Sequence, residues 1–174
     1  MLVRHLAYER KTIATGELWR LATGHLVDPW LSLAVFDLAT LLVLGAWLEL
    51  RSRALCATTL ALSAAAASAT IWFARPDLER YFGSSALGCG VLAALGVDHV
   101  LRGGARSARV LGVAALILLA LKLIADLGGS GAIVVLPPGI ELAAGAHVAG
   151  AVAGAVCAAT RLDRRARLPW RGPD

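Results

Sequence analysis

The stretch LSLAVFDLATLLVLGAWLEL occupies residues 31–50 and carries only two charged side chains, Asp37 and Glu49. An α-helix rises about 1.5 Å per residue, so about twenty residues cover the roughly 30 Å hydrocarbon layer of a bilayer. The stretch therefore predicts a transmembrane helix, and it sets the pattern for the rest of the chain.

Four further apolar runs follow it. Residues 54–74, 81–101 and 110–127 approach the length of a span. Residues 142–160 consist largely of Ala, Gly and Val and are less hydrophobic, which suits a helix buried against other helices. We expect an all-α membrane protein in which residues 31–160 form one bundle of about five transmembrane helices. No repeat or second domain is visible.

Composition excludes a soluble domain for most of the chain. Only 17% of the residues are charged, whereas soluble domains average about 25%, and the mean hydropathy is +0.70. The net charge of +5 could suggest nucleic acid as a partner. The basic residues, however, lie between the apolar runs and form no aromatic-interleaved patch for stacking bases. The lipid bilayer is the expected partner, and nucleic acid is not.

The cysteines and histidines give no sign of a metal site or other cofactor. Cys56, Cys89 and Cys157 lie inside apolar runs, where a thiol usually behaves as a small hydrophobe. They form neither a CxxC pair nor a disulfide framework. His5 and His25 match no metal-ligand spacing, so we expect no metal.

Basic residues predict the orientation of the bundle. Short loops make each helix antiparallel to the next, so the connections alternate between the two membrane faces. One face then carries ten Lys and Arg residues and the other six. The first set is Arg51, Arg53, Arg102, Arg106, Arg109, Arg161, Arg164, Arg165, Arg167 and Arg171; the second is Arg4, Arg10, Lys11, Arg20, Arg75 and Arg80. The richer face is cytoplasmic by the positive-inside rule.

This orientation assigns both ends of the chain. Residues 1–30 are amphipathic rather than spanning, and Trp19 and Trp30 are placed as interfacial aromatics usually are. We expect them to form an external surface segment. Residues 161–174 then form a basic cytoplasmic tail.

Two polar side chains should lie at matching depth beneath the external surface. Ser85 is four residues into the span that begins at residue 81, and His147 is five residues into the span that begins near residue 142. Both are then roughly 6 to 8 Å below the surface. A serine nucleophile needs a nearby base, and histidine suits that role. The alternative is a serine bonded to its own helix carbonyls and a histidine that is an interhelical donor.

Motifs around these residues point to one family. YFGSSA at residues 81–86 opens a helix with small residues, and AHVAGAVAG at residues 146–154 places Gly150 and Gly154 on a face that lets another helix approach closely. The pair resembles the GxSG and AHxxGxxxG motifs of the rhomboid intramembrane serine proteases. YER at 8–10 and GELWRLATGHLV at 16–27 are similar to the opening of the rhombosortase branch. The resemblance extends from Tyr8 to Gly154.

The resemblance implies a rhomboid-like bundle with a Ser-His dyad, Ser85 as nucleophile and His147 as general base. Rhombosortases are thought to process proteins that bear a C-terminal GlyGly-type sorting helix. The substrate would be a membrane-anchored protein cut near the outer face, in the bacterial inner membrane. No cofactor is implied.

The segment after residues 25–27 departs from the family pattern. Relatives usually continue with HxxxxHxxxN, whose second His and Asn help stabilise the oxyanion; here Asp28, Leu33 and Asp37 occupy those positions. Losing one oxyanion donor typically lowers kcat by about 10² to 10³. An ionised Asp37 would repel the developing charge, whereas a protonated one could donate a hydrogen bond. Backbone N–H groups near Ser85 remain as donors.

The nucleophile motif is altered too. Ala86 replaces the last Gly of GxSG, and Ser84 makes the register ambiguous. We favour Ser85, because Gly83 then holds the first motif position and supports the site. Cys89 lies where relatives tend to have His or Tyr.

Relatives normally carry one more span before the YxR segment, and here seven residues precede Tyr8. Either translation begins upstream of Met1 or the protein has five spans. Two other polar pairs have simple interpretations: Asp98 and His99 as an interfacial pair, and Lys122 and Asp126 as an i,i+4 ion pair.

Two other functions stay open. The changes at Leu33, Asp37 and Ala86 could indicate an inactive rhomboid-like protein that binds membrane proteins. A small transporter that uses Asp37, Asp98 and Lys122 is the weakest hypothesis, because no inverted repeat is visible.

Overall fold

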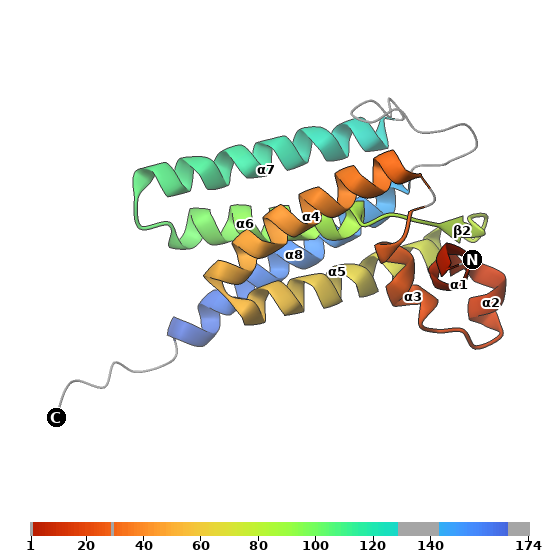
Figure 1. Cartoon of the computed structure of the whole chain (residues 1–174). Coiled ribbons are helices and arrows are strands. Elements are labelled where there is room, and N and C mark those ends of the chain that lie inside the picture. Colours follow the sequence, from red (N-terminus) through yellow and green to blue (C-terminus); the bar gives the residue numbers. More distant parts are fainter. Residues whose placement is uncertain (1, 29, 129–142, 167–174) are drawn as a thin grey trace.

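The computed structural model describes residues 2–28, 30–128 and 143–166, and they form an all-α bundle (Figure 1). Five long helices make up the body: α4 (Leu31–Arg51), α5 (Arg53–Ala74), α6 (Ser85–Arg102), α7 (Arg106–Leu127) and α8 (Ala144–Ala166). The short elements α1 (Leu2–Leu6), β1 (Tyr8–Glu9), α2 (Arg10–Ala14), α3 (Arg20–Thr23) and a 3-10 turn (Gly24–Leu26) gather at one end, together with β2 (Arg80–Tyr81).

The expectation of an all-α membrane bundle is confirmed. Helices α4 to α7 are each long and apolar enough to cross a membrane. In α4 and α7 only 6% and 11% of the apolar window is buried, compared with 61% in α6. Leu42 and Val43 on α4 and Ile124 on α7 are exposed, as expected for helices that face lipid tails. Helix α8 corresponds to the fifth predicted span, and its role as a span stays a prediction.

Two predicted boundaries differ from the structure. The third span was expected to begin at residue 81, but α6 begins at Ser85, because Arg80 and Tyr81 form a strand that pairs with β1. Ser85 is therefore the first residue of its helix. At the other end, α8 continues to Ala166, so residues 161–166 are helical; the cytoplasmic tail stays a prediction. The start of the fifth span at residue 142 and the tail residues 167–174 lie outside the described residues.

Small residues let α8 pack directly on the backbones of its neighbours. A Cβ added to Gly154 would overlap the carbonyl oxygen of Gly90, and one added to Gly150 would overlap that of Ala86. Ser63 on α5 donates a hydrogen bond to the Gly150 carbonyl at 3.1 Å. Backbone-to-backbone contact of this kind is how GxxxG faces associate in membranes.

Arginine side chains fasten the N-terminal segment to the bundle. Arg10 donates to three carbonyls at the C-terminal end of α5, those of Ile71 (2.8 Å), Trp72 (2.9 Å) and Arg75 (2.9 Å). Its guanidinium also lies 4.7 Å from the centre of the Trp72 ring. These carbonyls are the ones that a helix end leaves without partners, so Arg10 caps α5 and holds residues 8–14 against it.

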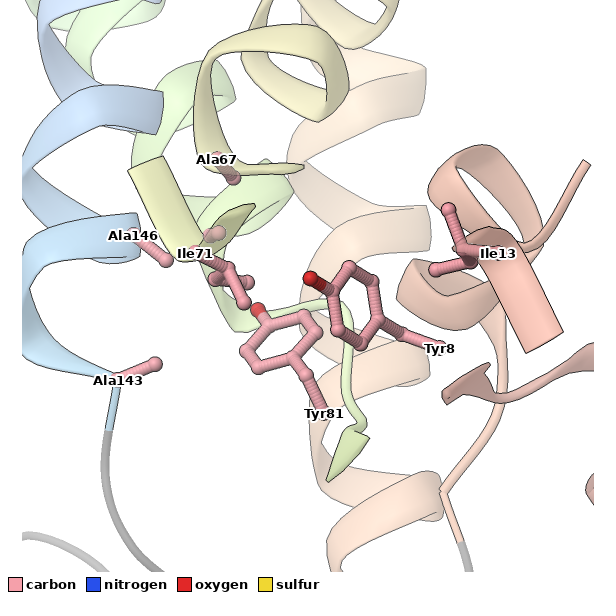
Figure 2. Close-up of a cluster of buried hydrophobic side chains, with 8 residues drawn as sticks. Tyr8, Ile13, Ala67, Ile71, Tyr81, Ala143 and Ala146 are labelled. Carbon is pink, nitrogen blue, oxygen red and sulfur yellow. The ribbon is translucent and has the colours of Figure 1, made fainter. Parts of the chain in front are cut away.

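A tyrosine pair continues this attachment toward Ser85. Tyr8 and Tyr81 are opposite each other in the β1–β2 pair, and their rings meet edge to face at 6.5 Å. Figure 2 shows the two rings together, with Ile71 beside them and Ala146 of α8 nearby. The segment that leads into α6 is thereby fixed to the N-terminal segment.

His25 is buried between the N-terminal segment and α5. The Ser68 hydroxyl donates to the Leu21 carbonyl at 2.6 Å, so its oxygen accepts from Nε2 of His25 at 2.9 Å. Burial lowers the pKa of His25 from 6.5 to about 4. The ring is therefore neutral in the folded protein at neutral pH.

The α6–α8 contact predicts a strong effect of one methyl group. Gly154→Ala should lower the free energy of unfolding by about 1–3 kcal/mol, because the backbones must separate. The matched control is Gly45→Ala on α4, where a Cβ meets nothing within 4 Å and better helix propensity should stabilise by up to about 1 kcal/mol. Unfolding in mixed micelles with rising SDS measures the stability of both variants. Equal changes in the two variants would contradict the close α6–α8 contact at Gly154.

His25 predicts a loss of stability in mild acid. The pKa of this histidine is 6.5 in the unfolded chain and about 4 in the folded chain, so the folded protein binds the proton only at lower pH. Unfolding free energy should therefore fall by up to about 3 kcal/mol as the pH drops between these values. His25→Gln keeps a donor for Ser68 and should lack this loss. If the unfolding free energies of wild type and His25→Gln change with pH in parallel in the same micelles, the prediction is wrong.

Candidate functional site

Ser85 and His147 are in direct contact. Ser85 Oγ lies 2.7 Å from Nε2 of His147, although the two residues are 62 positions apart. Ser85 begins α6, and His147 lies in the first turn of α8, where its side chain is 3% exposed. A hydroxyl at hydrogen-bond distance from an imidazole is the arrangement by which a serine is activated as a nucleophile.

A carboxylate follows on the other side of the imidazole. Nδ1 of His147 lies 2.7 Å from Oδ2 of Asp126, in the last turns of α7. Lys122 donates to the same oxygen at 2.5 Å, so the i,i+4 ion pair expected from the sequence is present. The Lys122 ammonium is also 3.3 Å from Nδ1. Sequence reasoning missed the contact between Asp126 and His147; the available signal was a carboxylate near the outer end of a span, close to the expected depth of His147.

Two further carboxyl groups of the site lie next to Gly83. Its φ of +99° lies in the region that favours glycine, and it lets the chain turn from β2 into α6. A Cβ added to Gly83 would lie 3.3 Å from Oδ2 of Asp37 and 3.6 Å from Oδ2 of Asp28. The Asp37 carboxyl also contacts the backbone N–H of Ser85. Burial raises the pKa of Asp28 above its usual range.

Comparison with known proteins identifies the family of the chain. A family model described as Rhomboid domain matches residues 15–164. The chain belongs to the rhomboid family. Rhomboids are serine intramembrane proteases that act on membrane protein substrates within the bilayer, and this rhomboid is an integral membrane protein. No curated protein and no solved structure matches the chain.

Tyr81 is a second residue of this rhomboid site that sequence reasoning missed. It is 6% exposed, its hydroxyl donates to the Gly83 carbonyl at 3.3 Å, and it contacts the Ser85 side chain. Burial raises the pKa of Tyr81, so the phenol keeps its proton and stays a donor. No residue pattern pointed to it, because its position depends on the pairing with Tyr8.

The serine next to the helix start has a different environment. Ser84 is 3% exposed and its Oγ has no hydrogen-bond partner among the described residues. Of the two neighbouring serines, Ser85 is the one in contact with His147. Ala86 is fully buried against α8, and Cys89 is buried one turn further along α6. Leu33, half-buried on α4, has no side-chain donor to offer an oxyanion.

Other ionisable residues lie elsewhere. Asp98, near the far end of α6, pairs with Arg51 at 2.6 Å and with Arg102. His99 bonds the Leu95 carbonyl at 2.8 Å rather than Asp98, and its ring is 5.2 Å from that of Trp47. The interfacial pair expected of Asp98 and His99 is therefore replaced by an Asp–Arg cluster.

One other place could hold a ligand. An apolar groove of about 840 Å³ lies between residues 13–22 and α5, and none of its lining residues belongs to the Ser85 site. Within the described residues, no three His, Cys, Asp or Glu side chains come together in a way that could hold a metal ion.

Proposed function

We propose that this rhomboid is a rhombosortase-like serine endopeptidase, with Ser85 as nucleophile and His147 as general base. The observation that supports it is the 2.7 Å contact between Ser85 Oγ and His147 Nε2. The contact joins two of the sequence motifs of the family, with His147 buried and Ser85 half-buried.

The chemistry follows from this contact. Ser85 Oγ bonds to the scissile carbonyl carbon while its proton passes to Nε2 of His147. The tetrahedral intermediate collapses when Nε2 returns that proton to the leaving amine. Water then gives its proton to His147 and attacks the acyl-enzyme, which releases the new carboxyl end and restores Ser85.

The oxyanion is where this rhomboid differs from its relatives. Its backbone donor is the Ser85 N–H, which the Asp37 carboxyl contacts. A protonated Asp37 could donate a hydrogen bond to the intermediate, whereas an ionised one would repel it. We infer that the enzyme is active in the form with protonated Asp37. Gly83 supports this site, because any side chain there would meet Asp37.

The expected substrates are membrane-anchored proteins with a GlyGly-type C-terminal sorting helix. This inference rests on the YER and GELWRLATGHLV segments. Tyr8 and Arg10 attach the N-terminal segment to the bundle, and Arg20 donates to the Ala7 carbonyl within that segment. In the orientation favoured by the basic residues, residues 1–30 and Ser85 lie at the outer face of a bacterial inner membrane. The C-terminus is then cytoplasmic.

A second function is favoured by two features of the site. The Asp37 carboxyl lies at the Ser85 N–H, and Leu33 supplies no donor. Both features suit an inactive rhomboid that binds membrane proteins without cutting them.

Active-site labelling tests the first function against the second. The wild-type protein in micelles should react with a fluorophosphonate probe, because a base next to the serine activates it. Ser85→Ala should abolish labelling, and His147→Ala should reduce it by about 10² or more. Ser84→Ala is the matched control and should label normally. Equal labelling of all four proteins, or none in the wild type, would contradict an active enzyme and favour the binding function.

Asp37→Asn should raise activity at neutral pH. The amide restores a neutral donor at the oxyanion position and removes a negative charge, so kcat should rise about 10-fold or more. The measurement is cleavage of a GlyGly-type membrane peptide by both proteins from pH 5 to pH 9. The gain should shrink in acid, where Asp37 is protonated. A variant that is slower than wild type at every pH would contradict the assigned role.

A further inference from the structure

The last turns of α7 add a carboxylate and an ammonium to the Ser85–His147 pair. Asp126 Oδ2 is 2.7 Å from Nδ1 of His147 and 2.5 Å from Nζ of Lys122. The side chains of His147, Asp126 and Lys122 are 3%, 10% and 30% exposed. A buried carboxylate that contacts an imidazole and an ammonium with one oxygen needs an explanation, since burying such charges is costly unless they are paired.

We propose that Asp126 is a positioning residue for His147, and that Lys122 holds the Asp126 carboxylate in place. The site is then a serine, histidine and aspartate in series rather than a serine and histidine alone. This inference rests on the proposed function, because His147 must act as the base for its orientation to matter in catalysis.

The hydrogen-bonding capacity of the groups supports this role. A neutral imidazole has one N–H donor and one acceptor nitrogen. An ionised carboxylate only accepts, so Asp126 requires the proton of His147 to be on Nδ1. The lone pair of Nε2 is then directed at the Ser85 hydroxyl, 2.7 Å away. When Ser85 attacks, Nε2 takes its proton, Nδ1 keeps its own, and the imidazolium charge forms next to the carboxylate.

Lys122 acts in the opposite electrostatic sense. Its ammonium neutralises the charge of Asp126 and lies 3.3 Å from Nδ1 of His147. It therefore disfavours protonation of the His147 ring, which would place a second positive charge beside its own. Among the described residues, Asp37 from α4 and Cys89 from α6 also interact electrostatically with this cluster. Ala67 and Ile71 of α5 pack in the apolar cluster that contains Ala146, the residue before His147. Asp126 and Lys122 therefore have opposite effects on the protonation of the His147 ring.

A purely structural role for Asp126 makes a different prediction. In that case its contact with His147 would tie the end of α7 to α8, and its loss would lower stability alone. The proton position on His147 and the pH at which the ring titrates would not depend on Asp126 and Lys122 with opposite signs. Those two readouts separate the roles.

Nitrogen-15 NMR of histidine in the micelle-embedded protein measures both the proton position on His147 and the pH at which its ring titrates. The chain has four histidines, and His147→Ala assigns the relevant signal. Wild type should show the Nδ1–H form at neutral pH. Asp126→Asn should shift the proton toward Nε2 and move the titration of the ring down by about one pH unit or more. Lys122→Met should move the titration up by a similar amount.

Kinetics provide the second readout. Asp126→Asn should lower kcat by about 10² to 10⁴ with little change in KM, because the proton on Nε2 faces Ser85. Lys122→Met should keep activity within about tenfold, with the low-pH limb of the profile moved to higher pH. Glu49→Gln is the control, since it also removes a carboxylate from an i,i+4 pair with an arginine but lies twelve residues along α4 from Asp37.

The outcomes separate the two proposals. An unchanged proton position and titration in Asp126→Asn, with kcat within threefold of wild type, would overturn the positioning role. Should Asp126→Asn fail to fold, the titration of Lys122→Met decides: an upward shift supports the role and no shift refutes it. A wild type that neither labels nor cleaves refutes the proposed function, and the NMR result still decides how His147 is held.

Discussion

Close contact between the backbones of α6 and α8 is the constraint on which the site depends. Gly154 faces the Gly90 carbonyl, and one turn earlier Gly150 faces that of Ala86. Ser85 immediately precedes Ala86, and His147 is three residues before Gly150. The register that brings the glycines onto the facing carbonyls therefore also brings the hydroxyl to the imidazole. A larger residue at the contact would widen the distance between the two side chains, whatever their own rotamers.

Membrane helices could be predicted well from the sequence because their signal is local. A run such as residues 31–50 is apolar throughout, and no tertiary contact is needed to recognise it. The start of the third span was wrong for the opposite reason: Arg80 and Tyr81 are extended because they pair with residues 8–9, and this pairing joins segments about seventy residues apart. Hydropathy carries no information about such a pairing.

The chemistry of the site could be predicted only in part. The motifs drew attention to Ser85 and His147, and their matched depth made contact possible. Asp126 was interpreted through its neighbour on the same helix, Lys122, and that pair exists. Its second contact, with His147, depends on how α7 lies against α8. The roles of these residues stay predictions.

The two-residue pairing of β1 with β2 also bears on how the molecule is made. Tyr8 leaves the ribosome long before Tyr81, and both α4 and α5 must be inserted before the two can meet. His147 arrives later still. The N-terminal segment therefore lacks its partner strand β2 during much of synthesis. A nascent chain that ends before His147 does not contain the assembled site. Ser85 and His147 can meet only once α8 is in place.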